Sequence, residues 1–350
     1  MTPAARLLSR AADWGRAPSA HNTQPWDVRA DGPDALVLGW HADRVLEVGD
    51  PTRRDLLLSL GCVAEALAIV AAEEGYAVRP AWQVDRGLRV AGRLELGPVD
   101  GVLGSVGAAE VAAPFSVAEL VARRTARAAY AEPFVTAEQV VEVEAAAGLG
   151  DAGRGETALG DAGIAARAGL AVLPPDVVET QLAVADRWTF DGPATGELRD
   201  WLRLDPQDPA YRRDGLSDAA LGLAGWERAG LRLALQPPVL GLLRRTRLTA
   251  LLGRTATARP LGTVVALTAH PDIRDDAVAD LGRSLLRVWL AAARAGLALH
   301  PLSQLLDCPA SSTRVQQEVT GAAGPEHTAY GVFRLGRPRT APARSHRLTD

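Results

Sequence analysis

The chain has 350 residues, of which 47% are hydrophobic and 23% charged, with a formal net charge of −4. This is the composition of a globular protein with two domains or one large α+β unit, and it excludes the basic surface that nucleic-acid binding requires. Arg6, Arg10 and Asp13 lie where a secretory signal would have its apolar core, and Glu65 interrupts the apolar run from Leu56 to Ala72. We therefore expect a cytoplasmic protein with no membrane span.

Two residue types limit the chemistry further. The two cysteines, Cys62 and Cys308, are too few and too isolated for a disulfide framework or a structural zinc site. All 38 basic residues are arginines, which excludes Schiff-base chemistry, pyridoxal phosphate attachment and the P-loop lysine. Arginine binds phosphate well through its forked donors, although a GC-rich genome would produce the same composition.

The first third of the chain is predicted to mix helices and strands. Gly75 is a natural C-cap for a long helix that is apolar on nearly every face and is therefore expected to be buried between layers. A period of two, with Leu88, Val90, Leu94 and Leu96 on one side, predicts paired strands after it. The expected elements are a helix over 3–14, a polar loop from Pro18 to Pro25, a strand over Ala35–Trp40, a helix over Arg53–Glu74, and strands over Tyr76–Val84 and Leu88–Leu96.

A glycine-rich stretch over 97–114 predicts a linker before a second series of elements. Ser116 with Glu119 forms a capping box, and Thr136 caps a further helix. The expected elements are helices from Ser116 toward Arg123, from Thr136 to Ala147, over Asp176–Trp188 and over Asp275–Ala295, and strands over Thr263–Thr268, Leu297–Pro301 and Thr328–Leu335.

The stretch over 206–259 is helical in pattern, rich in arginine and bracketed by prolines, and it belongs to neither series. Leu221, Leu223, Trp226 and Leu231 recur at helical spacing, so this segment needs an apolar surface to cover. We expect it to act as a lid.

Three common functional motifs find little support. Gly148, Gly150 and Gly153 satisfy the letters of a dinucleotide fingerprint, but the segment before them is predicted to be a helix rather than a strand, which favours a glycine-rich turn. No two of the six histidines stand at helical spacing with an acidic partner, so no metal site is expected. A G-x-S-x-G nucleophile elbow is absent.

Residues 17–26, Ala-Pro-Ser-Ala-His-Asn-Thr-Gln-Pro-Trp, are the most informative segment. Two prolines stiffen a loop that concentrates small hydrogen-bonding side chains, so it presents donors and acceptors at fixed positions to a polar, planar ligand. A capped surface loop that leads into a strand at Trp26 is the alternative interpretation.

This segment resembles the loop of the flavin nitroreductase family, in which a Pro-Ser-Ser-x-Asn-x-Gln-Pro-Trp stretch contacts FMN. The matching residues are Pro18, Ser19, Asn22, Gln24, Pro25 and Trp26. Ala20 departs from the pattern where many members have a second serine, so the resemblance implies that one hydrogen bond to the flavin is missing.

Residues 123–130, Arg-Arg-Thr-Ala-Arg-Ala-Ala-Tyr, are similar to a second motif of that family, Arg-x-Ser/Thr-x-Lys/Arg-x-Phe. The resemblance implies that Arg123 and Thr125 bind the FMN phosphate and ribityl chain, and that Arg127 reaches the N1/O2 edge of the flavin. Positive charge there favours the reduced cofactor. A solvated arginine face on a helix is the alternative.

Leu299-His300-Pro301-Leu302-Ser303-Gln304 is a third match, to the family's short strand whose backbone N–H faces flavin N5. The resemblance implies that Pro301 lies beside the flavin and that the N–H belongs to Ser303. A loosely aligned basic tail with Arg344 and Arg347 resembles the segment that completes the phosphate site.

The order of these motifs is reversed relative to an ordinary family member, in which the arginine motif precedes the Pro-Ser loop. The resemblance is therefore to the Acg-like branch, a single-chain pseudo-dimer with a lid over one shared flavin. It implies an α+β nitroreductase-like fold with one half over 1–110, a second over 111–350, and a monomeric chain.

The implied reaction is hydride transfer from NAD(P)H to flavin N5 and then to a small organic acceptor, with no catalytic side chain because the cofactor carries the chemistry. A protein that sequesters FMN with little turnover is one alternative. A flavin-dependent dehydrogenase of a specialised substrate is another, because a fold does not fix a function.

Overall fold

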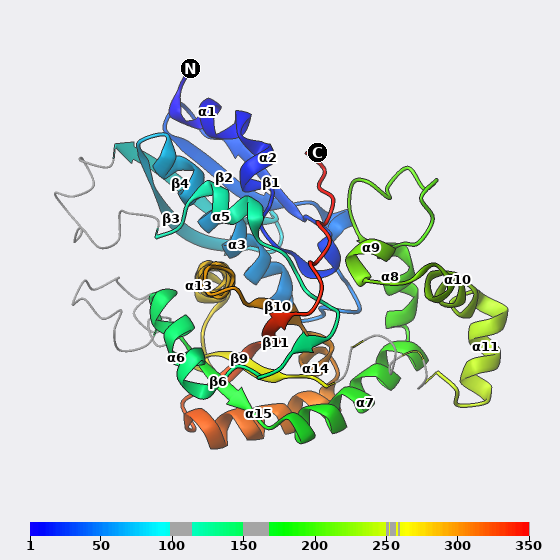
Figure 1. The fold of residues 1–350 in the computed structure, drawn as a ribbon. Coiled ribbons are helices and arrows are strands. Elements are labelled where there is room, and N and C mark those ends of the chain that lie inside the picture. The colour runs from blue at the N-terminus through cyan, green and yellow to red at the C-terminus, as the bar shows by residue number, and fades with distance from the viewer. Residues whose placement is uncertain (99–113, 150–167, 250–251, 253–256, 258–259, 350) are drawn as a thin grey trace.

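The computed structural model describes residues 1–98, 114–149, 168–249, 252, 257 and 260–349. These residues form a mixed α+β architecture with two antiparallel sheets, one at each end of the molecule, and two long helices between them (Figure 1). The α+β class predicted from the sequence agrees with this arrangement.

The first sheet has the strand order β1-β2-β4-β3, and the long helix α3 packs against it. Its register pairs Trp26 with Trp40 and Tyr76 with Pro98. The elements up to residue 98 are α1 (Pro3–Ser9), α2 (Ala11–Trp14), a 3-10 turn η1 (Ala20–Asn22), β1 (Trp26–Ala30), β2 (Ala35–Trp40), η2 (Ala42–Arg44), α3 (Arg54–Glu73), β3 (Tyr76–Asp85) and β4 (Val90–Pro98).

The second sheet has the order β10-β11-β9-β6, and the short strand β5 pairs with the end of β11. Helices α7, α14 and α15 cover one face, while α6 and α13 lie on the other side (Figure 1). The elements are α5 (Val117–Ala122), β5 (Tyr130–Ala131), α6 (Ala137–Ala146), β6 (Gly169–Leu173), α7 (Pro175–Asp191), β9 (Thr263–Ala269), α13 (Asp275–Arg294), β10 (Ala298–Pro301), α14 (Gln304–Asp307), α15 (Pro309–Ala323) and β11 (Thr328–Pro338).

Helices α3 and α13 cross in close contact at two glycines. A Cβ on Gly61 would lie 1.8 Å from the Ala279 carbonyl oxygen, and one on Gly282 would lie 2.2 Å from that of Leu58. The absence of side chains at these positions lets the two backbones meet. Because α3 packs on the first sheet and α13 also contacts the second, this crossing joins both sheets in one hydrophobic core.

A buried carboxylate reinforces the crossing. Glu65 on α3 accepts hydrogen bonds from Arg283 (3.0 Å) and Arg287 (2.6 Å) on α13. These guanidinium groups outweigh the cost of burial and lower the pKa of Glu65. Glu65, which interrupts the apolar run in the sequence, is therefore part of the contact between the two helices.

The segment between α7 and β9 extends away from the sheets on one side of the molecule (Figure 1). Its described elements are α8 (Ala194–Trp201), β7 (Leu202–Arg203), β8 (Leu216–Ser217), α9 (Asp218–Leu221), α10 (Gly225–Ala234) and α11 (Pro237–Arg245). The expectation that its apolar residues dock is confirmed for Leu221, which lines the cavity described below, and is wrong for Trp226, which is 76% exposed. Helices α10 and α11 protrude and cover no part of that cavity.

Most predicted elements are confirmed within a few residues, and the differences are as follows. The helix expected over 3–14 is divided at Arg10, which leaves the helical conformation. Leu88 is 74% exposed in the turn before β4 and does not belong to its buried face. Strands β5 and β6 and helices α8, α14 and α15 were not predicted, and β1 begins at Trp26, where the alternative interpretation of the polar loop placed a strand. Gly148 has a positive φ after α6, while Gly150, Gly153 and most of the expected linker lie outside the described residues.

Helix α3 corrects the expectation that Glu65 makes its apolar run too short for a membrane span. By length and mean hydropathy it is the one described helix that would suffice to cross a membrane, because Glu65 alone does not offset its apolar residues. However, 83% of its most apolar window is buried inside the protein, which is typical of a core helix.

Candidate ligand-binding cavity

A cavity of about 250 Å³ lies where segments distant in the sequence meet. Its walls come from the loop before β1, the first turns of α3, the α7–α8 region, residues 300–307 and β11. Trp188, Phe190, Trp289 and Phe333 supply aromatic surface to it. The volume is just below the range of roughly 300–1,000 Å³ usual for small-molecule sites.

The loop singled out in the sequence forms one wall. Pro18 and Ser19 line the cavity, and the Ser19 hydroxyl accepts a hydrogen bond from the Gln24 backbone N–H at 2.9 Å. His21, Asn22 and Gln24 all have positive φ angles, which are uncommon for residues other than glycine. Such strain is concentrated at functional sites, and the surrounding contacts must compensate for it.

Asn22 and Gln24, predicted to contact a ligand, have their side chains engaged elsewhere. The Asn22 amide donates to the carbonyl oxygens of Gly215 and His346, each at 3.1 Å. Gln24 donates to the Arg213 carbonyl at 2.9 Å and accepts from the Leu348 N–H at 2.9 Å. Neither residue lines the cavity. In this structure they tie the loop to residues 213–215 and to the C-terminal tail.

Arg127 lines the cavity, and its Nη1 donates to the Ala220 carbonyl oxygen at 3.0 Å. Burial lowers the pKa of its guanidinium to about 10, which leaves the group charged at neutral pH. Thr125 does not line the cavity; it forms a parallel bridge with Leu299 that holds this segment beside β10.

Arg123 does not line the cavity itself but contacts Trp289, which does. Its side chain is stacked 4.6 Å from the Trp289 ring centre, and the residue is only 7% exposed. Nη2 donates to the Arg16 carbonyl at 3.1 Å, but Nε and Nη1 are buried without a hydrogen-bond partner. Burial lowers the pKa of this group to about 10. A buried cation with two unused donors is costly unless an anion binds it.

Other arginines lie close to Arg123. Arg347 donates to the Gly15 carbonyl at 2.9 Å and to Asn22 Oδ1 at 2.7 Å, and Arg16 donates to the Ser345 carbonyl. Burial and the charges of Arg344 and Arg16 lower the pKa of Arg124. The cluster formed by Arg16, Arg123, Arg124, Arg344 and Arg347 therefore concentrates positive charge around Arg123, with Arg344 on its exposed side.

Residues after β10 form the opposite wall. Pro301 and Ser303 line the cavity, and Ser303 begins the short helix α14. His300 also lines it and is held by Arg334 on the neighbouring strand β11. Of the eleven residues predicted to bind a cofactor, the structure thus brings five to the cavity. They are Pro18, Ser19, Arg127, Pro301 and Ser303.

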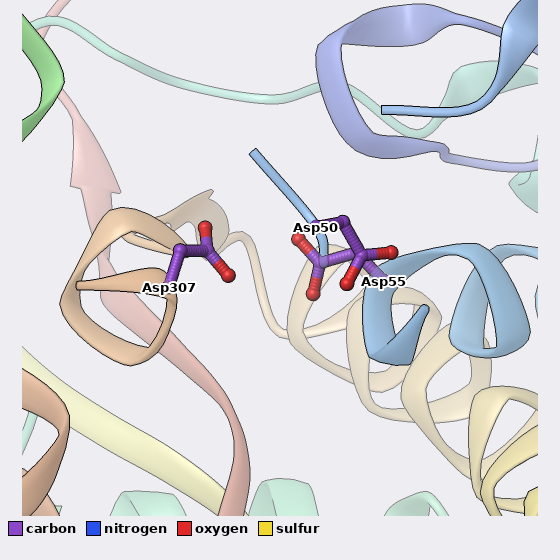
Figure 2. A group of neighbouring side chains, drawn as sticks. All are labelled: Asp50, Asp55 and Asp307. Atoms are coloured by element: carbon purple, nitrogen blue, oxygen red, sulfur yellow. The ribbon is translucent and has the colours of Figure 1, made fainter. Parts of the chain in front are cut away.

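A cluster of carboxylates at the cavity was not predicted. Oxygen atoms of Asp50, Asp55 and Asp307 lie within 4.8 Å of one another (Figure 2). Arg54 Nη2 donates to Asp55 at 2.8 Å and to Asp307 at 2.7 Å, so a guanidinium already links two of the three. No sequence signal joins Asp307 to the others because about 250 residues separate them.

Burial and the neighbouring Asp55 carboxylate raise the pKa of Asp50 to about 7 and that of Asp307 to about 8. One arginine cannot balance three ionised acids in a buried place, so the cluster retains protons near neutral pH. Asp55 and Asp307 line the cavity directly, which places an exchangeable proton at its wall.

No family model matches the sequence, and no curated protein sequence is significantly similar to it. Solved structures do resemble it, each over 65% of this chain. The FMN-dependent nitroreductase NfnB from Mycobacterium smegmatis, solved with NADPH, is 16% identical, with 92% of its own chain covered and a TM-score of 0.35. A nitroreductase with bound FMN from Bacteroides fragilis is 14% identical (91% covered, TM-score 0.34), as is a BluB-like flavoprotein from Clostridium difficile (93%, 0.35). Similarity this low does not assign a function.

Proposed function

We propose that the cavity binds FMN and that the protein is a flavin-dependent oxidoreductase of nitroreductase type. The observation that carries the proposal is Arg123, a buried guanidinium with two unused donors in a cluster of arginines beside an aromatic-lined cavity. A phosphate group attached to a planar ring system would satisfy both ends of this site.

The residues present fit this cofactor. Arg123 and Arg344 would hold the phosphate, and Ser19 would contact the ribityl chain. Arg347, whose donors already bind carbonyl oxygens and Asn22, would reach the phosphate only by exchanging these partners. Thr125 does not line the cavity and would contact the ribityl chain only if its segment moved toward it. Arg127 would lie at the N1/O2 edge of the flavin ring, and Pro301 and Ser303 would lie beside N5. Asn22 and Gln24 would contact the flavin only by exchanging their present partners; otherwise they shape the loop. FMN, when bound, supplies the transfer of a hydride between NAD(P)H and an organic acceptor.

The chain's own residues would bind the cofactor, orient it and shield it from water. Arg127 holds positive charge at the cavity wall, where it would stabilise negative charge on a bound ring. The aromatic side chains that line the cavity would exclude water from the faces of a bound ring. The Asp307 carboxyl, with its raised pKa, holds a proton at the cavity wall where an acceptor would take one up.

We further propose that residues 1–110 and 111–350 are two nitroreductase-like halves that share one site. In support, the glycine crossing of α3 and α13 brings the two regions together, and the cavity takes walls from both. Arg347 and Leu348 return from the C-terminus to residues 15–24. Because only one Pro-Ser loop and one Arg-x-Thr-x-Arg motif exist, one FMN per chain is expected.

One observation favours slow turnover and thus the sequestration alternative. Phe190, Ala194, Leu198, Leu216 and Leu221 line the cavity from the segment over α7–α9. A cover of this kind would restrict the stacked approach of a nicotinamide ring that direct hydride transfer requires. The covering residues begin before 206, so the lid that we propose includes the end of α7 and all of α8.

Two measurements on the purified protein test the proposal. We expect a flavin absorbance spectrum, or saturable uptake of added FMN, with one FMN per chain. A colourless protein that takes up no FMN would overturn the proposal, and two flavins per chain would overturn the shared site. Oxidation of NAD(P)H with quinone or nitro acceptors then separates the alternatives, because rapid turnover would contradict sequestration.

A further inference from the structure

Arg334 is an anchored cation inside the second sheet. Its side chain is fully buried on β11, with the guanidinium stacked 4.5 Å from the Tyr130 ring centre. Nε donates to the Leu261 carbonyl at 2.8 Å, and Nη1 to that of Arg127 at 3.4 Å. Contacts on several sides leave this planar group one orientation.

That orientation determines which ring nitrogen of His300 carries a proton. Nη1 of Arg334 lies 3.3 Å from Nδ1 of His300, and both groups are buried. A guanidinium has donors and no acceptor, so Nδ1 must accept and carry no proton. The neutral imidazole then has its single proton on Nε2, and a second proton on Nδ1 would put two donors in contact.

The surroundings also oppose a charged ring. Burial, with the positive charges of Arg127 and Arg334, lowers the pKa of His300 well below its ordinary value. These two arginines come from the segment before β5 and from β11. The nearby Tyr130 is un-ionised because burial raises the pKa of its hydroxyl, so it supplies no compensating negative charge.

We infer that Arg334 locks His300 as a neutral Nε2–H donor that faces the cavity and selects ligands with a carbonyl or nitro oxygen. His300 lines the cavity and uses Nδ1 for Arg334, which leaves Nε2 for a ligand. It precedes Pro301 and Ser303, so the donor lies beside the wall proposed to contact the flavin. Arg334 is a positioning residue, because it acts through the ring.

The ligand part of this inference rests on the proposed function, but the tautomer does not. In protein labelled with 15N-histidine, long-range 1H–15N spectra report the protonation of each ring nitrogen. The His300 signals are assigned by their loss in His300→Gln. We expect a protonated Nε2 and an unprotonated Nδ1, unchanged from pH 5.5 to 8. A doubly protonated ring at pH 6, or the Nδ1–H tautomer, would overturn the inference.

Arg334 is tested by the same spectra. Arg334→Lys keeps a cationic donor and is expected to keep the tautomer, whereas Arg334→Met removes the donor and is expected to give a mixture of tautomers. If Arg334→Met does not fold, the wild-type pH series and the His300 variants still decide the inference. An unchanged tautomer in folded Arg334→Met would show that Arg334 does not position the ring.

Ligand selection is measured with 1,4-naphthoquinone and naphthalene, which have the same two-ring carbon skeleton, whereas only the quinone carries carbonyl oxygens. Trp188 and Trp289 line the cavity, so tryptophan fluorescence reports binding. His300→Phe should weaken quinone binding about 10-fold or more and leave naphthalene unchanged, while His300→Gln, which keeps an N–H donor, should recover part of it. Equal losses for the two probes, or no loss, would refute selection by His300. Failure to bind FMN would refute the proposed function alone.

Discussion

At the scale of single residues, burial sets the protonation of the acids at the cavity. The raised pKa of Asp307 should make the stability of the protein depend on pH. Folding raises the pKa of Asp307 to about 8 and that of Asp50 to about 7, above the ordinary value near 3.8. At pH values between the unfolded and the folded pKa, these carboxyls keep protons in the folded protein that they have lost in the unfolded chain. The free energy of unfolding should therefore fall as the pH rises from about 5 to 8.

Asp307→Asn is expected to reduce that fall. Asparagine cannot ionise, and its carbonyl oxygen can still accept from Arg54. We expect the variant to gain about 3–4 kcal/mol relative to wild type between pH 5 and pH 8, measured by urea unfolding at both pH values. Asp31→Asn, at an exposed ion pair with Arg93, is the control. Parallel pH dependences in wild type and Asp307→Asn would contradict the assignment.

At the scale of elements, Glu197 of α8 connects this helix by hydrogen bonds to the loop after β2. The Glu197 carboxylate accepts the backbone N–H groups of Glu47, Val48 and Gly49, the last at 2.6 Å. Glu197 also lines the cavity, so this contact holds part of the proposed lid against the body.

Glu197→Gln should weaken the hydrogen bonds to the loop without unfolding the protein, because the amide keeps one good acceptor and loses the charge. We expect amide hydrogen exchange at residues 47–49 to accelerate about 10-fold, with little change in the core strands β9 and β11. Glu142→Gln, on an exposed position of α6, serves as the control. Unchanged exchange at 47–49 would show that Glu197 does not hold the lid.

At the scale of the whole molecule, the two sheets depend on one helix crossing. Gly282→Ala would place a Cβ 2.2 Å from the Leu58 carbonyl and 2.9 Å from Gly61 Cα, so α3 and α13 would have to separate. We expect a loss of about 1–3 kcal/mol or more in the free energy of unfolding. Gly230→Ala, on α10 with open space around it, should be neutral or slightly stabilising. Equal stabilities of the two variants would refute the close crossing.

Sequence reasoning predicted elements better than side-chain directions. The Ser116 capping box, the Thr136 N-cap and the helices that they begin are confirmed, because caps and periodicity are local signals. Whether Asn22 points into the cavity depends on Gly215 and His346, which are distant in the sequence. The Asp50, Asp55 and Asp307 cluster depends in the same way on tertiary contact. Trp226 has the spacing of a docked helix yet stays exposed, because periodicity does not show what an apolar face covers.

The central claim is that Arg123 and its neighbours bind the phosphate of FMN. The most direct test compares the dissociation constants of FMN and riboflavin, which differ by that phosphate, for wild type and Arg123→Gln stripped of flavin. A charge-assisted contact worth about 2–3 kcal/mol predicts that wild type binds FMN roughly 30- to 150-fold more tightly, and that Arg123→Gln loses most of this preference. Equal binding of FMN and riboflavin by wild type, or an undiminished preference in folded Arg123→Gln, would contradict the account.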